Sequence, residues 1–435
     1  MAESELPVIL YGLRIGELVR TGGRALLRWS DAAERRWGIN SPALSNGLRV
    51  GLASIDATEA FFGALLPEGD ALDRLARQVG TSSNDLVGIL ERVGADLVGA
   101  LSVGGAGTRR EAAHVLTGDE LQVALRDAHG FLLGESGGAV GGGGSAVAGI
   151  QRKLALTRID GQWAVGNDNV PSTHILKPVA AGARMIVIRE QYTLDLARAL
   201  GLTTFGSWIE TIGEQSVLVV ERYDRTDVNG VITRLHQEDM AQALVLPWGG
   251  NDKFQWANPA ANLAAIAAAL DRERSIFDTG PSQRERLLRY VTFNVAVGNT
   301  DAHAKNYSIL RPEEGPPQLA PLYDAAPIML SYDASQRLAL YVDDQQWLPD
   351  VTVDHLANEA VRWGVADARA REIIVDTLEQ LVVATHDVVA DPIIGATVPG
   401  FIRGQTKNLL AGKRAALDIG GPLGLQTRID STTHD

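Results

Sequence analysis

The 435-residue chain contains no cysteine, which excludes disulfide bonds, thiolate metal sites and cysteine nucleophiles. It also lacks any stretch of about 18 or more uncharged apolar residues, so we expect no membrane-spanning helix. The first six residues begin acidic and show no signal-peptide pattern. These absences predict a soluble, cytoplasmic protein that makes no contact with a membrane.

Basic residues are also scarce, because 40 lysines and arginines face 53 aspartates and glutamates and leave a net charge of −13. Proteins that bind nucleic acid by themselves usually carry a basic surface, since neutralising phosphates dominates that affinity. Tight DNA binding by this chain alone is therefore disfavoured. Hydrophobic residues are plentiful at 45%, and the length is sufficient for two or three domains with real cores.

The most informative segment is 298–308, which reads GNTDAHAKNYS, with Asp324 further along the chain. An Asp, an Asn five positions later and a separate downstream Asp form the layout that protein kinases use for base and magnesium ligands. Asp301 could accept the proton of an acceptor hydroxyl, while Asn306 and Asp324 supply oxygens suited to Mg²⁺. Such a spacing can also arise by chance on a loop. The pattern predicts phosphoryl transfer from ATP.

A glycine-rich segment at 134–149 precedes an expected strand at 150–156. Backbone amides of such a segment can approach phosphate closely, because glycine has no Cβ. The segment matches neither the Walker A pattern nor the usual kinase G-x-G-x-x-G, and four consecutive glycines more commonly mean a flexible linker. The elements that follow favour the phosphate-binding interpretation.

Lys177 ends a short apolar run, and Glu190 begins a helical pattern that continues to residue 200. In a kinase such a lysine reaches the α and β phosphates and pairs with such a glutamate, although an ordinary solvated lysine at a strand end is the alternative. The apolar run 216–220 then breaks into polar residues, where a kinase hinge offers backbone groups to adenine. This order of elements is the one that a two-lobe kinase requires.

Eight motifs along the chain carry a family resemblance. In the N-terminal part they are YGLRIGEL (11–18), FFGALLPEG (61–69) and GADLVGAL (94–101). In the remainder they are AGIQRK (148–153), THILKP (173–178), VERYDR (220–225), HQEDM (236–240) and NTDAHAKN (299–306). On these motifs the chain resembles the HipA family of toxin-type serine/threonine kinases over nearly its whole length.

The resemblance implies an ATP- and Mg²⁺-dependent site. It makes Asp301 the catalytic base, Asn306 and Asp324 the magnesium ligands, and Lys177 the lysine that contacts phosphate, with His303 beside the phosphates. It further implies that the nucleotide is bound by two groups of residues: Ala148, Gly149, Ile150, Gln151, Arg152 and Lys153 over the phosphates, and Glu221, Arg222 and Tyr223 at the adenine.

In the family, a serine of the glycine-rich segment is autophosphorylated, which ejects the loop and switches the kinase off. The corresponding position in this chain is Ala146. Ser145 lies one residue earlier and is the candidate for autophosphorylation, while Ser136 is more remote. A phosphate there would add roughly two negative charges beside the nucleotide.

The resemblance also implies partners. The expected substrate is a protein, namely a translation component such as an aminoacyl-tRNA synthetase, whose phosphorylation arrests growth. A small DNA-binding antitoxin of the HipB type would hold the kinase inactive, and DNA would be reached only indirectly through it. Two alternatives stay open: an antitoxin-binding subunit that acts mainly in operon autoregulation, and a small-molecule phosphotransferase.

The expected fold is α+β, with the two lobes of a protein kinase. We expect an extra β-rich N-terminal subdomain (1–105), a mixed β N-lobe that binds nucleotide (106–245) and an all-helical C-lobe (246–435). The motif at 236–240 is expected to start a helix that Gln237 and Glu238 cap. Helices are further expected at 190–200, 260–270, 286–297, 354–362, 366–388 and 403–416.

Overall fold

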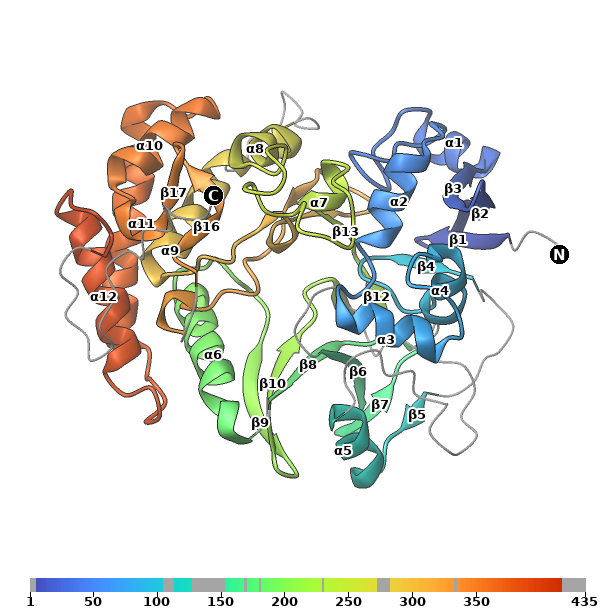
Figure 1. The fold of residues 1–435 in the computed structure, drawn as a ribbon, viewed down its shortest axis with the longest axis horizontal. Helices are drawn as coiled ribbons and strands as arrows, with labels where there is room; N and C mark the ends of the chain where they lie inside the picture. The colour runs from blue at the N-terminus through green and yellow to red at the C-terminus, as the bar shows by residue number, and fades with distance from the viewer. Residues whose placement is uncertain are drawn as a thin grey trace, which may run out of the picture.

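The computed structural model describes residues 5–104, 113–126, 153–167, 170–179, 181–228, 231–271, 282–331 and 335–416. Within these ranges no helix is long and apolar enough to cross a membrane. Three parts surround a central region in Figure 1: the blue N-terminal subdomain, the green N-lobe sheet and the orange and red C-lobe helices.

The N-terminal subdomain is an antiparallel sheet of order β3-β2-β1-β4, packed against helices. Alternate residues of β1 are buried, as expected for a sheet with one face on a core. The core includes Phe61 and Phe62. Its described elements are β1 (Leu6–Leu10), β2 (Leu13–Thr21), β3 (Arg24–Trp29), α1 (Asp31–Trp37), α2 (Ile55–Gly63), α3 (Asp70–Gln78), α4 (Leu86–Val93) and β4 (Leu101–Val103). This subdomain therefore holds as many described helices as strands, rather than being mainly β.

The N-lobe is a sheet of order β5-β7-β6-β8-β10-β9 with antiparallel neighbours. Leu176 packs toward the side chains of α5, and the next residue, Lys177, points to the opposite face, where α6 lies. The elements are β5 (His114–Val115), α5 (Gly118–Arg126), β6 (Leu154–Ile159), β7 (Gln162–Val165), β8 (His174–Val179), α6 (Arg184–Ala199), β9 (Ser207–Ile212) and β10 (Gln215–Glu221). Strand alternation therefore directs the expected phosphate lysine toward α6.

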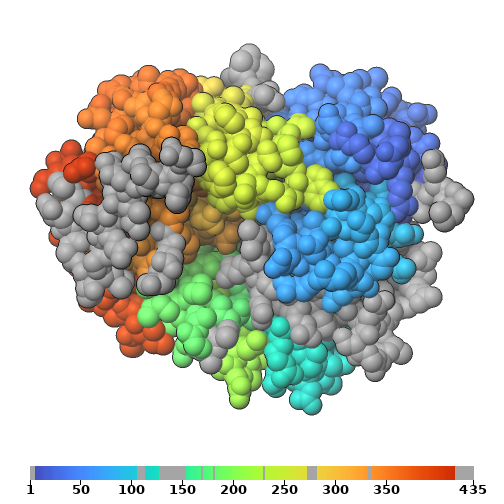
Figure 2. Space-filling view, in the orientation of Figure 1, coloured from blue at the N-terminus to red at the C-terminus, as the bar shows by residue number. Residues whose placement is uncertain are grey.

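The C-lobe core is formed by helices whose apolar faces meet around the buried helix α9, for example at Phe293 and Ile402. The helices are α8 (Leu263–Asp271), α9 (Gln283–Val297), α10 (Val353–Arg362), α11 (Asp367–Asp387) and α12 (Thr397–Leu410). The helices expected at 190–200, 260–270, 286–297, 354–362, 366–388 and 403–416 are all present. Both α6 and α12 begin six residues before the expected start, so Glu190 lies inside α6 and does not begin it. Figure 2 shows the yellow-green residues of this part packed directly beside the blue N-terminal subdomain.

Two further expectations need correction, although the α+β class is confirmed. The C-lobe is not all-helical, because strands β14 (Ser308–Arg311), β15 (Gln318–Leu319), β16 (Arg337–Val342) and β17 (Gln345–Trp347) follow the expected catalytic loop. Residues 236–239 form strand β13 (His236–Asp239), which pairs with β14, so they do not start a helix. Asp239 instead caps the short helix α7 (Met240–Ala243) through a capping box with Gln242.

The remaining strands form a hairpin of β11 (Arg225–Val228) and β12 (Val231–Arg234) directly after the hinge strand β10. Arg225 of β11 donates to the Leu97 carbonyl, and Arg234 of β12 donates to the Leu101 carbonyl at the start of β4 in the N-terminal subdomain. The hairpin therefore connects the hinge to the N-terminal subdomain.

Candidate active site

A cavity of about 680 Å³ lies where the three parts of the molecule meet. Its wall includes Glu68 from the N-terminal subdomain, Lys177 from β8 and Asp301 from the loop after α9. This size suits a nucleotide-sized ligand.

Lys177 lies at the centre of a charged cluster on one side of the cavity. Its Nζ is 2.5 Å from Glu190 Oε1 and also pairs with the carboxylate of Asp324. Burial would lower the pKa of Lys177, but the two carboxylates outweigh it and raise that pKa. Lys177 is therefore positively charged at physiological pH, and it is held in place by Glu190 of α6 and by Asp324.

The loop that carries Asp301 is fixed by its own side chains. Helix α9 ends at Val297, and its C-cap Gly298 has a φ of 80°, the left-handed conformation that glycine adopts most readily. Asn299 Oδ1 accepts a hydrogen bond from the Asp301 amide at 3.2 Å, and Asn306 Nδ2 donates to the Asp301 carbonyl at 2.9 Å. The five-residue spacing seen in the sequence therefore closes a compact loop.

The Asp301 side chain faces the cavity. Desolvation of the carboxylate by the surrounding protein, and next the negative charge of Asp324, raise the pKa of Asp301 to about 6. The positive charge of Lys253 opposes this rise. A carboxylate with a pKa near neutrality is suited to general-base catalysis.

Asp324 adopts a left-handed φ of 54°, which is uncommon for a residue other than glycine. Its neighbour Tyr323 holds the segment in place by donating to the Lys305 carbonyl at 2.7 Å. Burial would raise the pKa of Asp324, but Lys177 and Lys153 outweigh it and hold that pKa far below its usual range. Asp324 is thus an anion beside the cavity.

The donor set fits magnesium rather than a metal held entirely by protein. Asn306 uses its Nδ2 for the Asp301 carbonyl, which leaves its Oδ1 for a cation, and Asp324 adds carboxylate oxygen. Among the described residues no group of three or more His, Asp or Glu side chains could hold a metal ion. Mg²⁺ usually takes one or two protein oxygens and completes its shell with phosphates and water.

His303 is buried in the wall of the same cavity. Burial, and next the charge of Lys253, lower the pKa of His303 to about 3, so its ring is neutral at physiological pH. The His303 ring is nearly perpendicular to the Phe254 ring, with 5.2 Å between the ring centroids. Its Nδ1 is buried and has no hydrogen-bond partner within the described ranges, so it is placed to bind a polar group in the cavity.

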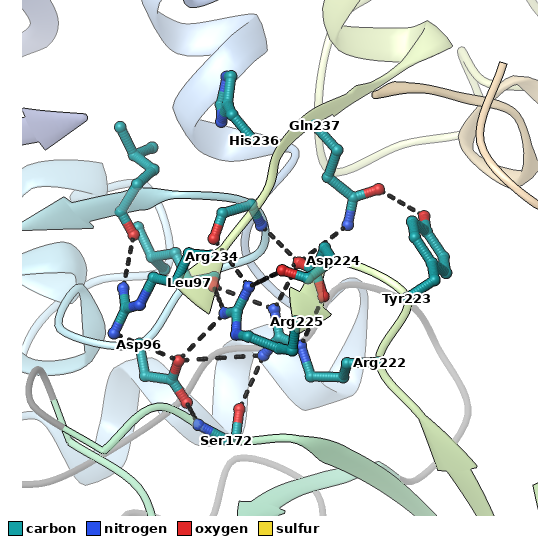
Figure 3. A network of polar contacts seen from close by, with 12 residues as sticks. Asp96, Leu97, Ser172, Arg222, Tyr223, Asp224, Arg225, Arg234, His236 and Gln237 are labelled. Carbon is teal, nitrogen blue, oxygen red and sulfur yellow. Dashed lines mark hydrogen bonds and ion pairs between the residues drawn. The ribbon is translucent and has the colours of Figure 1, made fainter. Parts of the chain in front are cut away.

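The expected adenine-binding residues Glu221, Arg222 and Tyr223 border the cavity. The guanidinium of Arg222 donates to Asp224 and Ser172 (Figure 3). The Tyr223 ring stands between the rings of Phe205 and Tyr323, at 5.9 and 5.5 Å. An aromatic wall at this place suits a flat base.

Beneath the hinge, a buried polar network joins the kinase core to the N-terminal subdomain (Figure 3). Asp224 pairs with Arg222 and Arg225, and Asp96 of the N-terminal subdomain is 3.3 Å from Arg225 and 3.8 Å from Arg234. The carbonyl oxygen of Leu97 accepts from both hinge arginines. The hinge is therefore fixed by residues far away in sequence.

The structure brings together every sequence-predicted site residue that it describes. Ser145 and residues 148–152 lie outside the described residues. The following all border the cavity: Lys153, Lys177, Glu221, Arg222, Tyr223, Asp301, His303, Asn306 and Asp324. Sequence reasoning missed Glu68 and Lys253, which also border it, because no local spacing connects them.

These features define a protein-kinase-like fold with a phosphotransferase site. A family model for the HipA-like C-terminal domain matches residues 145–385, and one for the HipA N-terminal domain matches residues 6–104. The chain belongs to the HipA family and is a kinase.

Relatives agree with this assignment. The protein Y4mE of Sinorhizobium fredii, named as a kinase, is 30% identical over 76% of this chain and 79% of its own length. The serine/threonine-protein kinase toxin HipA of Shewanella oneidensis is 27% identical over 68% of this chain and 69% of its own. A solved complex of Shewanella oneidensis HipA with HipB and operator DNA has a TM-score of 0.76 and 22% identity, covering 93% of this chain and 96% of that one.

Proposed function

We propose that this chain is an ATP- and Mg²⁺-dependent serine/threonine protein kinase that acts as the toxin of a toxin–antitoxin pair. Its substrate would be a translation component such as an aminoacyl-tRNA synthetase, and phosphorylation would arrest growth. The observation that carries the proposal is the placement of Asp301, with a raised pKa, in one cavity with the Lys177, Glu190 and Asp324 cluster.

Each residue has a stated role in the proposal. Lys177 binds the α and β phosphates, and Glu190 orients it. Asp324 and Asn306 would hold Mg²⁺, which supplies charge neutralisation on the phosphate oxygens when bound. His303 donates or accepts a hydrogen bond beside the phosphates, and Tyr223 forms part of the adenine wall.

Asp301 orients the acceptor hydroxyl and takes its proton. The hydroxyl oxygen bonds to the γ-phosphorus while the bond to the β,γ-bridging oxygen breaks, and ADP leaves with that electron pair. The pKa of about 6 leaves Asp301 largely ionised at neutral pH and still basic enough to accept the proton.

The partner proposal is a small HipB-like antitoxin that contacts DNA on behalf of the complex. The net charge of −13 supports a separate basic partner for DNA. The related Shewanella oneidensis HipA has been solved together with HipB and operator DNA.

The test is incubation of the purified protein with Mg²⁺ and γ-labelled ATP, beside Asp301→Asn. We expect wild type to transfer label to protein, and the variant to lose about 10²–10⁴-fold in rate while still binding nucleotide. Mass spectrometry of segment 130–155 then checks whether Ser145 or Ser136 is the self-modified serine.

Equal rates in the two forms would contradict the base assignment. Label in a metabolite rather than in protein would favour the small-molecule phosphotransferase. Nucleotide binding without any transfer would favour a subunit that mainly binds antitoxin.

A further inference from the structure

A second charged cluster borders the cavity on the side of Asp301, and its carboxylate comes from the N-terminal subdomain. Lys253 Nζ is 2.5 Å from Glu68 Oε2, and Lys305 Nζ is 3.2 Å from Glu68 Oε1. All three side chains are nearly buried and border the cavity. Burial would raise the pKa of Glu68, but the two lysines outweigh it and lower that pKa to about 2. Glu68 is therefore an anion that both lysines share, and Lys305 has Asp239 as a second carboxylate neighbour at 3.8 Å.

The two lysines differ in how their donors are used. Lys305 Nζ donates to the Ala64 carbonyl at 2.7 Å and lies near both Glu68 and Asp239. Within the described ranges, Lys253 Nζ has Glu68 Oε2 as its one hydrogen-bond acceptor. An ammonium has three N–H donors, so Lys253 keeps donors for an anion in the cavity.

Lys253 is attached to the catalytic loop by its backbone and by its neighbour. The Ala304 amide donates to the Lys253 carbonyl at 3.1 Å, three residues after Asp301. The next side chain, Phe254, packs against His303. Lys253 is also the cation that most strongly stabilises the Asp301 carboxylate. The Lys253 ammonium therefore lies on the Asp301 side of the cavity, where the hydroxyl that accepts the phosphoryl group would bind, whereas Lys177 lies beside Asp324.

We infer that Lys253 is a further catalytic residue, which donates to the oxygens of the transferred phosphoryl group, and that Glu68 is a positioning residue supplied by the N-terminal subdomain. This inference rests on the proposed kinase function. The γ-phosphorus of bound ATP would lie within bonding reach of the hydroxyl that Asp301 orients, and Lys253, which borders the same side of the cavity, would reach one of its equatorial oxygens. Those oxygens carry charge throughout the transfer described above, and a fixed ammonium stabilises them without reorganisation.

The test compares Lys253→Met, Lys253→Arg and Glu68→Gln, using γ-labelled ATP, Mg²⁺ and dephosphorylated casein as a generic acceptor. Lys407→Met on the exposed face of α12 and Glu59→Gln in the N-terminal subdomain are matched controls. We expect Lys253→Met to lower kcat about 100-fold with the KM for ATP within about threefold of wild type.

The conservative changes separate a catalytic role from a structural one. Lys253→Arg keeps the charge, so it should recover about tenfold of the loss in kcat despite its different shape. Glu68→Gln should lower kcat about tenfold and leave the KM for ATP unchanged. The substitution makes the position of the Lys253 ammonium less fixed, but residue 68 itself does not contact the nucleotide in this proposal. Nucleotide binding measured by a fluorescent ATP analogue checks that each variant is folded.

Wild-type kcat in Lys253→Met would overturn this inference, as would equal losses in the Met and Arg variants. A raised KM for ATP with unchanged kcat would also overturn it, since it would place Lys253 on the nucleotide rather than on the transferred group. An inactive wild type would overturn the proposed function itself, which distinguishes the two failures.

Discussion

Asp96→Asn tests the buried network beneath the hinge. Asp96 is 1% exposed, and its Oδ2 accepts a hydrogen bond from the Ser172 amide at 3.0 Å. Its other oxygen faces Arg225 at 3.3 Å and Arg234 at 3.8 Å. The three arginines of the network already exceed its two aspartates by one charge, and the substitution doubles that excess.

The expected loss follows from the burial of the remaining charges. Removing one partner of a buried ion pair typically costs about 3–5 kcal/mol, because the other charge stays desolvated. The carbonyl oxygens of Leu97 and Gly99 still accept from Arg225, so we expect the lower end, about 3 kcal/mol of unfolding free energy. Asp56→Asn removes an exposed partner of Arg24 and should cost less than about 1 kcal/mol.

Urea unfolding followed by tryptophan fluorescence measures both variants against wild type. ATP affinity, measured in the same preparations, should fall for Asp96→Asn and not for Asp56→Asn, because Arg222 connects the network to the cavity wall. A loss of stability for Asp96→Asn no larger than that for Asp56→Asn would refute this reasoning.

Three further predictions concern single side chains. Glu190→Gln removes a partner of Lys177 and should lower kcat/KM for ATP about tenfold, or about 1.4 kcal/mol, in steady-state kinetics. His236 has a pKa of about 4, below about 6.5 for the unfolded chain, so the unfolded state takes up the proton first on acidification. Wild type should therefore lose about 2 kcal/mol more than His236→Gln between pH 7 and pH 5 in urea unfolding. Gly298→Ala imposes a side chain at φ 80° and 2.8 Å from Phe401, so thermal unfolding should reveal a loss of about 2 kcal/mol.

The parts of the site that the sequence predicted are those set by local geometry. The spacing from Asp301 to Asn306 reflects a loop that closes on itself through one hydrogen bond. Strand alternation directs Lys177 to the face opposite Leu176, and α6, which follows β8 along the chain, brings Glu190 to it from its middle turns. These relations depend on neighbouring backbone, so they can be recognised in the sequence.

The parts that were missed depend on contacts across the chain. Glu68 and Lys253 are 185 residues apart, and no spacing rule says which carboxylate meets which lysine. The strands after the catalytic loop were missed for a similar reason. They are two to six residues long, and β14 is defined by its pairing with β13 from a different part of the chain.

The buried charges between the N-terminal subdomain and the kinase core favour one arrangement of the two. Glu238 of the core accepts from the Asn46 amide at 3.0 Å and from Arg311 at 2.8 Å, which adds a third junction to those of Glu68 and Asp96. Buried ion pairs contribute little net stability but are costly to break on one side. Displacing the N-terminal subdomain would therefore leave Lys253 without Glu68 and the hinge arginines without Asp96, and phosphoryl transfer would fall although no cavity residue of the core had changed. Amide hydrogen exchange measures this coupling. Faster amide exchange in segment 94–99 without faster exchange in segment 222–225 would contradict this coupling.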